Sequence, residues 1–226
     1  MKKIILITGG SDGVGKALAE NLSDIYQVVI LSKDKEKTEI VAKEIGADFV
    51  VADVTKSEEV REAVKKIIDK YQKIDVLVNN AGLWTQGLIE ESEDSVIKDI
   101  LDVNTYGTIL MTKYVVPHMK KEKVGKIINV ISQAGLYGKA ERSIYNTSKW
   151  AISGFTKSIE LELSKFGISV NGFYPGAIKT DIFKKTGNDR NMDNYMEKDD
   201  VVRVLRFIIE TKSNLNFPEI GVKSIE

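Results

Sequence analysis

The sequence predicts a doubly wound parallel α/β fold, with about seven strands and helices on both faces of the sheet. Three observations support this fold class. Short apolar runs alternate with charged stretches of helical period, the first run passes directly into a glycine turn, and the residues after each run are polar or glycine. Apolar strands that alternate with helices imply a parallel sheet, buried on both faces, with right-handed crossovers.

Six apolar runs have the length and composition of buried strands. They are Ile4–Ile7, Val28–Leu31, Phe49–Val51, Val76–Val78, Ile127–Ile131 and Ile168–Phe173. A short final strand is expected at Ile220 and Val222, which occupy alternate positions. Neither an internal repeat nor a low-complexity linker interrupts the series, so residues 1–226 are expected to form a single domain.

The stretches between the runs carry apolar residues at helical spacing. They include Val14–Leu22, the set Val60, Val64, Ile67 and Ile68, the segment Ile97–Thr108, and a helix that opens near Tyr145 and runs to about Phe166. The stretches Ile97–Met111 and Trp150–Leu163 suit a paired-helix dimer. Trp150, Phe155 and Ile159 suit the core of one subunit equally well.

The composition excludes several classes of function. The 33 basic and 33 acidic residues give a net charge of zero without a basic block, so nucleic acid is not an expected partner. Cysteine is absent and His118 is the only histidine, so we expect no thiol chemistry and no metal site. The first apolar run is too short for a signal peptide, and no run approaches the roughly 20 residues of a membrane span. We therefore expect a cytoplasmic protein that does not bind a membrane.

A glycine turn follows the first apolar run, with the pattern Thr8-Gly9-x-x-x-Gly13-x-Gly15. Strand, tight turn and helix in this order form the Rossmann-type arrangement, in which backbone N–H groups and a helix N-terminus face a phosphate. Glycine turns also join strands to helices without binding anything, so the turn alone does not establish a nucleotide site.

The ends of the other strands carry the same polar character. In a doubly wound sheet the ligand lies at the carboxyl ends of the strands. The residues found there are Thr8-Gly9-Gly10, Ser32-Lys33-Asp34, Ala52-Asp53-Val54, Asn79-Asn80-Ala81-Gly82, Ser132 and Tyr174-Pro175-Gly176. This is the composition expected of a cofactor crevice.

Ser132, Tyr145 and Lys149 form a candidate catalytic group. Tyr145 and Lys149 are four residues apart, which puts both side chains on one helix face. An unperturbed tyrosine has a pKa of about 10, and a nearby ammonium lowers it. Such a tyrosine can exchange a proton with a substrate oxygen, and Ser132 can hydrogen-bond the same oxygen. Each piece alone is common by chance, so the combination carries the hypothesis.

In these features the sequence resembles the short-chain dehydrogenase/reductase family, from Lys3 to about Asp181. Asn104, Ser132, Tyr145 and Lys149 match the catalytic tetrad of that family. The segments that match its other motifs are Thr8–Gly15, Asn79–Gly82, and Pro175-Gly176 followed by Thr180.

The resemblance implies a role for each of these residues. Tyr145 would be the general acid in carbonyl reduction, Lys149 would tune Tyr145 and bind the nicotinamide ribose, and Ser132 would hold the carbonyl oxygen. Asn104 would hold a water that relays protons to Lys149, a role compatible with a helix-bending asparagine in the core. The cofactor residues implied are Thr8, Gly9, Ser11, Asp12, Gly13, Val14, Gly15, Ser32, Lys33, Asp53, Val54, Asn80, Ala81, Gly82, Tyr145, Lys149, Pro175, Gly176, Ile178 and Thr180.

The choice between NADP and NAD depends on the end of the second strand. An acidic residue there would bind the ribose 2′-OH of NAD, whereas this chain has Ser32 and Lys33, which suit the 2′-phosphate of NADP. Asp12 and Asp34 argue for NAD, and the segment Lys33–Lys37 also fits a solvated charge run. We expect NADP as the cofactor, with NAD as the alternative.

The substrate is less well defined. The resemblance places Trp84, Ser132, Ala134, Tyr137 and Tyr145 at the substrate pocket, with a variable lid over Ile182–Met196 that includes Lys184, Lys185, Arg190 and Tyr195. A small carbonyl or alcohol compound is expected, and a 3-oxoacyl thioester is one candidate. The same fold also occurs in dinucleotide-binding regulators without catalysis. The family resemblance further implies a homodimer or homotetramer, although the short carboxyl end puts the tetramer in doubt.

Overall fold

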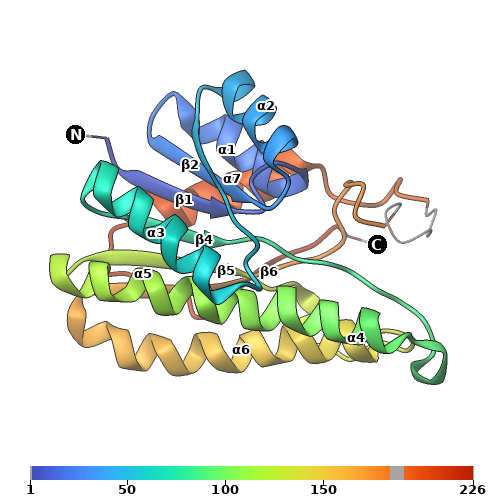
Figure 1. Ribbon diagram of the computed structural model, residues 1–226. Helices are drawn as coiled ribbons and strands as arrows, with labels where there is room; N and C mark the ends of the chain where they lie inside the picture. Colours follow the sequence, from blue (N-terminus) through green and yellow to red (C-terminus); the bar gives the residue numbers. More distant parts are fainter. Residues whose placement is uncertain (1, 184–190, 226) are drawn as a thin grey trace.

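The computed structural model describes residues 2–183 and 191–225, which form one sheet with helices on both faces (Figure 1). The strands are β1 (Ile4–Thr8), β2 (Gln27–Ser32), β3 (Asp48–Val51), β4 (Val76–Asn79), β5 (Gly125–Val130), β6 (Ile168–Pro175) and β7 (Ile220–Val222). The helices are α1 (Gly13–Ser23), α2 (Lys35–Ile45), α3 (Ser57–Tyr71), α4 (Asp94–Leu101), α5 (Thr108–Glu122), α6 (Ser143–Leu163) and α7 (Lys198–Glu210). Shorter helical turns span Ile89–Glu91 (η1), Asp102–Gly107 (η2), Gln133–Gly135 (η3) and Ser164–Phe166 (η4).

The sheet confirms the predicted fold class. Its strand order is β3-β2-β1-β4-β5-β6-β7, and every neighbouring pair is parallel. The order reverses between β1 and β4, because the chain first builds outward from β1 through β2 to β3 and then returns to the other side. That reversal is the point at which doubly wound folds bind their ligands.

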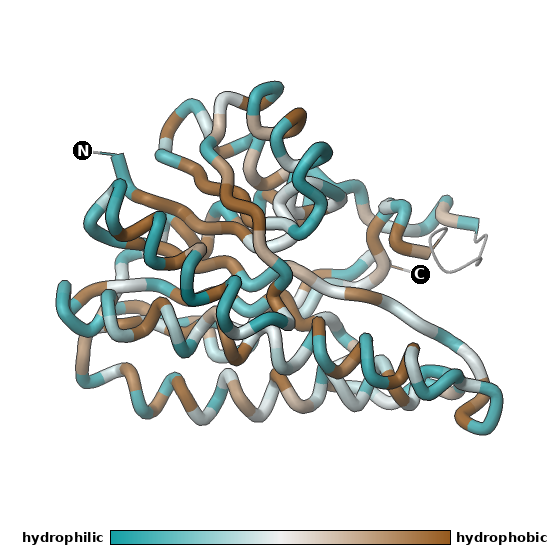
Figure 2. The backbone as a smooth tube through the Cα atoms, in the orientation of Figure 1, coloured by the Kyte–Doolittle hydropathy of each residue, from teal (hydrophilic) through white to brown (hydrophobic). Residues whose placement is uncertain are grey.

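Two helical layers enclose the sheet. Helices α3, α5 and α6 pack with Leu6, Leu77 and Ile127 on one face, whereas α1, α2 and α7 pack with Ile5, Ile30 and Ile128 on the other. Each strand therefore alternates its side chains between two separate apolar cores. Figure 2 shows the consequence, with hydrophobic strands inside and hydrophilic segments along the outer faces of the helices.

Aspartate side chains from the glycine turn and from the end of β2 cap the N-termini of α1 and α2. The Asp12 carboxylate accepts a hydrogen bond from Gly13 N (2.7 Å) at the start of α1, and the Asp34 carboxylate accepts one from Lys37 N (3.0 Å) at the start of α2. Such caps satisfy backbone donors that no helical carbonyl can reach. Both helix N-termini consequently open toward the carboxyl ends of β1 and β2.

The helix expected over Ile97–Thr108 continues much further than its pattern indicated. Helix α4 passes through η2, a π-helical turn, directly into α5, so that helical structure runs from Asp94 to Glu122. The wider turn shifts the phase of the apolar face, which is why a fixed helical period ends near Thr108. On α6, Trp150 is exposed and Ile159 is buried against the sheet, which separates two residues that the sequence left undecided.

Within the described ranges, 2–183 and 191–225, no helix is both long enough and apolar enough to cross a membrane.

Candidate functional site

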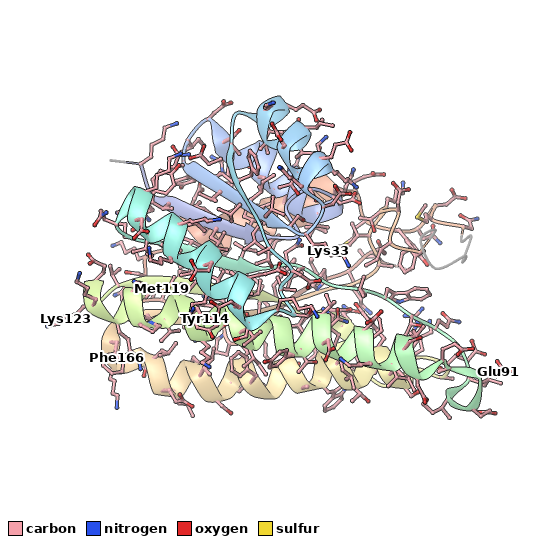
Figure 3. All side chains as sticks on the ribbon, viewed as in Figure 1. Lys33, Glu91, Tyr114, Met119, Lys123 and Phe166 are labelled. Atoms are coloured by element: carbon pink, nitrogen blue, oxygen red, sulfur yellow. The ribbon has the colours of Figure 1, made fainter. Side chains whose placement is uncertain are left out.

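A cavity of about 660 Å³ lies along the carboxyl ends of the strands, across the reversal in strand order. Figure 3 labels Lys33 at this edge of the sheet, whereas Met119, Lys123 and Phe166 lie at the opposite end of the molecule. The cavity receives residues from both sides of the reversal, as the fold class requires.

Most of the site residues predicted from the sequence line this cavity. Those that do are Gly9, Ser11, Asp12, Gly13, Val14, Ser32, Lys33, Asp53, Val54, Asn80, Ala81, Gly82, Trp84, Ser132, Tyr145, Lys149, Pro175, Gly176, Ile178 and Thr180. They come from the ends of six strands and the helices that follow them, and the fold brings them together over one continuous surface.

Thr8 and Gly15 are not part of the lining and lie beneath it. The Thr8 hydroxyl accepts hydrogen bonds from the backbone N–H groups of Asn80 and Ala81, both at 3.0 Å, and the Asn80 amide donates to Thr8 O at 2.9 Å. At Gly15, an added Cβ would come within 2.4 Å of Gly9 O. Thr8 therefore joins the ends of β1 and β4, and Gly15 allows the turn to pack closely. Both residues support the cavity from below and do not line it.

Ser132 and Tyr145 meet in the cavity. The Tyr145 phenol hydrogen-bonds the Ser132 side chain. Burial raises the pKa of Tyr145, and the Ser132 hydrogen bond and the Arg142 guanidinium oppose that rise. Arg142 is thus a cation near Tyr145 that the sequence did not predict, and the predicted tuning of Tyr145 by Lys149 stays a prediction.

Ser132 has an unusual backbone conformation. Its φ is 120°, a region that residues with a side chain rarely adopt. Its Oγ accepts a hydrogen bond from Ala134 N at 3.2 Å, which holds the serine at the start of η3. Such strain costs about 1–3 kcal/mol and collects at functional positions, where the surrounding structure enforces it.

Lys149 lies one helical turn after Tyr145, with its ammonium 5.7 Å from the centre of the Tyr145 ring. It is only 7% exposed, and Nζ donates a hydrogen bond to Val130 O at 3.2 Å. Burial lowers the pKa of Lys149 to about 8. This lysine is therefore poised to change its charge close to physiological pH.

Asn104 lies behind the cavity, inside the π-helical turn. Its side chain accepts a hydrogen bond from Leu83 N (2.7 Å) and donates to Leu83 O (2.9 Å) and Ser148 Oγ (3.0 Å). It thereby fixes the segment after β4 against α6. These contacts make Asn104 a positioning residue in this structure, and its predicted water relay stays a prediction.

The β2 end of the cavity gathers charged groups. Lys37 lines it beside Lys33, and Lys37 Nζ pairs with the Asp12 carboxylate at 2.7 Å. The sequence analysis grouped Lys37 with a solvated charge run. Its contact with Asp12 joins the starts of two helices, and the two residues are 25 positions apart, so the local sequence does not indicate this contact. The four-residue spacing between Lys33 and Lys37 is the sequence signal that could have placed Lys37 beside Lys33.

Asp53 marks the third strand end in this part of the cavity. Its carboxylate accepts hydrogen bonds from Thr55 N (2.9 Å) and Thr55 Oγ1 (2.8 Å). Burial disfavours the charged form, but the Thr55 hydrogen bonds and then Lys33 and Lys56 prevail, so the pKa of Asp53 lies below its usual value. Asp53 thus holds a turn with Thr55 and also lines the cavity.

The opposite end of the cavity is aromatic. The Trp84 and Phe183 rings meet edge to face at 4.9 Å, and Phe183 meets Tyr195 in the same way at 5.7 Å. Arg142, from the start of α6, lies over Trp84 with Cζ 5.9 Å from the ring centre. Phe183 and Arg142 were not identified as pocket residues in the sequence.

Ala134 and Tyr137 do not join the cavity lining, although the sequence placed them in the substrate pocket. The η3 turn carries the chain away from the cavity after Ser132, and Tyr137 is 67% exposed. Lys184, Lys185 and Arg190 of the predicted lid lie outside the described residues.

The cavity fits a dinucleotide. Gly13 has a φ of +52°, and among the described residues a Cβ added there would find only Thr180 Cγ2 nearby, at 3.8 Å, so glycine leaves the N-terminus of α1 open to a phosphate. A Cβ on Gly82 would stand 3.3 Å from Asn104 Oδ1 and 3.7 Å from Lys149 Nζ. The two glycines thus leave open the surface beside the N-terminus of α1 and the surface beside Lys149.

Comparison with known proteins agrees with this geometry. Residues 3–191 match the short chain dehydrogenase family. The chain is 33% identical to a 3-oxoacyl-[acyl-carrier-protein] reductase of Synechocystis, covering 91% of this chain and 88% of the relative. It is 31% identical to an uncharacterized oxidoreductase of Staphylococcus saprophyticus, covering 99% and 97%.

Solved structures give the same result. ElxO with NADP bound superposes with a TM-score of 0.89 at 32% identity, over 98% of this chain and 97% of ElxO. An actinorhodin polyketide ketoreductase with NADPH gives 0.90 at 25% identity, over 99% and 96%. A family match over most of the chain, together with the Ser132, Tyr145 and Lys149 geometry, shows that this chain belongs to the short-chain dehydrogenase/reductase family of NAD(P)-dependent oxidoreductases.

Proposed function

We propose that this chain, acting as one domain over residues 1–226, is an NADPH-dependent reductase of a small carbonyl compound. The observation that carries the proposal is the position of the Ser132–Tyr145 pair. It lies in a single cavity between a lysine-bearing end at β2 and an aromatic end at Trp84. A nucleotide-binding regulator needs the glycine turn but gains nothing from a proton donor held in this way.

The residues divide the reaction between them. NADPH, when bound along the glycine turn, would supply the hydride that the carbonyl carbon accepts. Ser132 Oγ–H donates a hydrogen bond to the carbonyl oxygen, and Tyr145 O–H transfers its proton to that oxygen as negative charge develops there. The Lys149 ammonium stabilises the resulting phenolate and binds the cofactor ribose. The raised pKa of Tyr145 keeps the phenol protonated before the reaction, as reduction requires.

Reduction is expected to weaken as the pH rises through about 8. Burial lowers the pKa of Lys149 to about 8, so the ammonium is present below that pH and is lost above it. Without the ammonium, the Tyr145 phenolate forms less readily. A profile of kcat/KM for reduction between pH 6 and 10 should fall on its alkaline side, and a profile that stays flat to pH 10 would contradict the role of Lys149.

Support for NADP comes from the β2 end of the cavity. Lys33 and Lys37 both line it, and the Asp34 carboxylate, the candidate ligand for NAD, caps α2. The Asp12–Lys37 pair is exposed, and exposed pairs contribute only about 0–1 kcal/mol, so Lys37 can exchange Asp12 for a phosphate at small cost. ElxO and the polyketide ketoreductase were solved with NADP and NADPH, respectively.

Lys33→Ala tests the cofactor assignment. A charge-assisted contact contributes roughly 1.5–3 kcal/mol, so NADPH binding should weaken about tenfold or more while NADH binding stays nearly unchanged. The loss should shrink at high salt, because exposed charges are screened. Dissociation constants are measured by fluorescence titration of each cofactor.

Lys35→Ala is the matched control, since Lys35 is an exposed lysine at the start of α2 that is not part of the cavity lining. It removes the same charge and should leave both dissociation constants unchanged. Equal weakening of NADPH and NADH by Lys33→Ala would overturn the assignment to NADP.

The substrate class is tested by a panel of ketones, aldehydes and 3-oxoacyl thioesters, with NADPH absorbance as the readout. A 3-oxoacyl thioester is included because the Synechocystis relative is named as a 3-oxoacyl reductase. NADPH binding without turnover on the whole panel would favour the regulator. We further infer a cytoplasmic homo-oligomer that associates through the exposed Trp150 and Leu161 of α6.

A further inference from the structure

Arg142 introduces a charge into the aromatic end of the cavity. It is the residue that precedes the first turn of α6, and its side chain is half-buried in the cavity lining. Its guanidinium lies against the Trp84 ring, 5.9 Å from the ring centre. Stacking on an aromatic face orients the planar guanidinium, and its five N–H donors leave room for an additional anionic ligand.

Aromatic rings make up much of the surface around Arg142. Trp84 and Phe183 are 5% and 8% exposed, and Tyr195 extends the same aromatic wall. These rings come from two segments, one after β4 and one after β6, so the wall exists only in the folded chain. An apolar wall with one cation beside it suits a ligand that has an apolar body and one negative end.

The cation is close to the reacting group. Arg142 directly precedes α6 and Tyr145 lies in the first turn of that helix, so both residues are at the same end of α6. Burial raises the pKa of Tyr145, the Ser132 hydrogen bond lowers it, and so does Arg142, which means that positive potential reaches the phenolic oxygen. Asp99 and Asp181 also line the cavity, but both are exposed to solvent, which screens their charges.

We propose that the substrate is a 2-oxo or 3-oxo carboxylic acid with an apolar tail, and that Arg142 binds its carboxylate while Ser132 and Tyr145 hold its keto oxygen. The proposal rests on the reductase function proposed above and names its substrate class. The products are the 2-hydroxy or 3-hydroxy acids, formed when the carbonyl carbon accepts the hydride of NADPH and its oxygen accepts the Tyr145 proton.

The position of the two groups sets the distance between carboxylate and carbonyl. Arg142 and Tyr145 border the cavity at the same end of α6, so a ligand that touches both has its two polar groups separated by few bonds. Zero or one methylene between carboxylate and carbonyl fits this span. Bidentate hydrogen bonding to the carboxylate would also fix which face of the carbonyl meets the cofactor.

A pair of ketones that differ only in charge provides the test. The substrates are 2-oxo-4-phenylbutanoate and its amide, together with 3-oxo-3-phenylpropanoate and its amide, each assayed with NADPH and the full chain. We expect kcat/KM to favour at least one acid over its own amide by roughly 10- to 100-fold, the contribution of a charge-assisted hydrogen bond.

Variants then assign the preference to Arg142. Arg142→Gln should reduce the acid-to-amide ratio of kcat/KM by about tenfold or more, and Arg142→Lys should restore part of it because the charge returns without the planar fork. The ratio removes any effect of Arg142 on Tyr145, since that effect acts on both ketones. Lys139→Gln is the control: Lys139 lies three residues earlier in the same loop, is exposed, and should leave the ratio as in the parent.

A binding measurement separates this proposal from the function on which it rests. Trp84 and Trp150 are the only two tryptophans, so Trp150→Phe leaves Trp84 as the fluorescent reporter inside the cavity. In the presence of NADP⁺, 4-phenylbutanoate should quench Trp84 at least about tenfold more tightly than 4-phenylbutanamide, and Arg142→Gln should abolish the difference. Equal affinities for acid and amide, or equal turnover of both, would overturn the carboxylate assignment. Selective acid binding without any turnover would instead overturn the reductase.

Discussion

Tyr145→Phe is expected to reduce carbonyl reduction by at least about 10²-fold, the usual cost of losing a positioned general acid. The substitution keeps the ring and removes only the hydroxyl that hydrogen-bonds Ser132. Cofactor affinity should therefore stay within a few fold of the parent, so that the loss appears in kcat. Steady-state kinetics and a cofactor titration on the same preparation measure the two quantities.

Tyr106→Phe provides the matched control, because Tyr106 is an exposed tyrosine on the outer helical face. It should behave as the parent in both assays. Turnover by Tyr145→Phe that approaches the parent rate would show that another group supplies the proton, and the mechanism would fail.

Lys149→Met is expected to lower both turnover and cofactor affinity, in contrast to Tyr145→Phe. Lys149 is buried in the cavity lining, one turn from Tyr145, and its ammonium is placed to serve the phenolate and the cofactor ribose. We expect a loss of roughly 10²-fold in kcat/KM and about tenfold in cofactor affinity. The pKa of any residual activity should rise, because the cation that stabilises the phenolate is gone.

Lys126→Met separates the role of Lys149 from the general cost of removing a buried lysine. Burial lowers the pKa of Lys126 to about 8 as well, but its Nζ donates to Ile208 O (2.5 Å) and Thr211 O (2.6 Å) at the end of α7. Its replacement should lower the free energy of unfolding and leave cofactor affinity unchanged. If Lys149→Met also changed only stability, Lys149 would be a structural residue.

The sequence alone was sufficient for the fold and for most of the cavity lining, because both depend on local patterns. Apolar runs identify strands, and in a parallel sheet every strand end arrives at the same edge. Ser132, Lys33 and Asp53 could thus be placed at one site without knowledge of any contact between them.

The residues that the sequence missed depend on contacts between distant segments. Lys37 enters the site through its pairing with Asp12, and Arg142 through its position against Trp84. No local pattern encodes either contact. Ala134 and Tyr137 were misplaced for the opposite reason, since they follow Ser132 closely in the sequence but leave the cavity through the tight turn of η3.

The backbone conformation of Ser132 lowers the stability of the fold, whereas the Ser132 side chain is the one that the proposed mechanism needs. With φ at 120°, the residue that would relax this conformation is glycine, which has no hydroxyl to offer the substrate. Ser132→Gly is therefore expected to stabilise the fold and, at the same time, to remove the hydroxyl on which the proposed mechanism depends. On the proposed mechanism, a serine at this position lowers the stability of the protein and keeps a hydroxyl oxygen in the site.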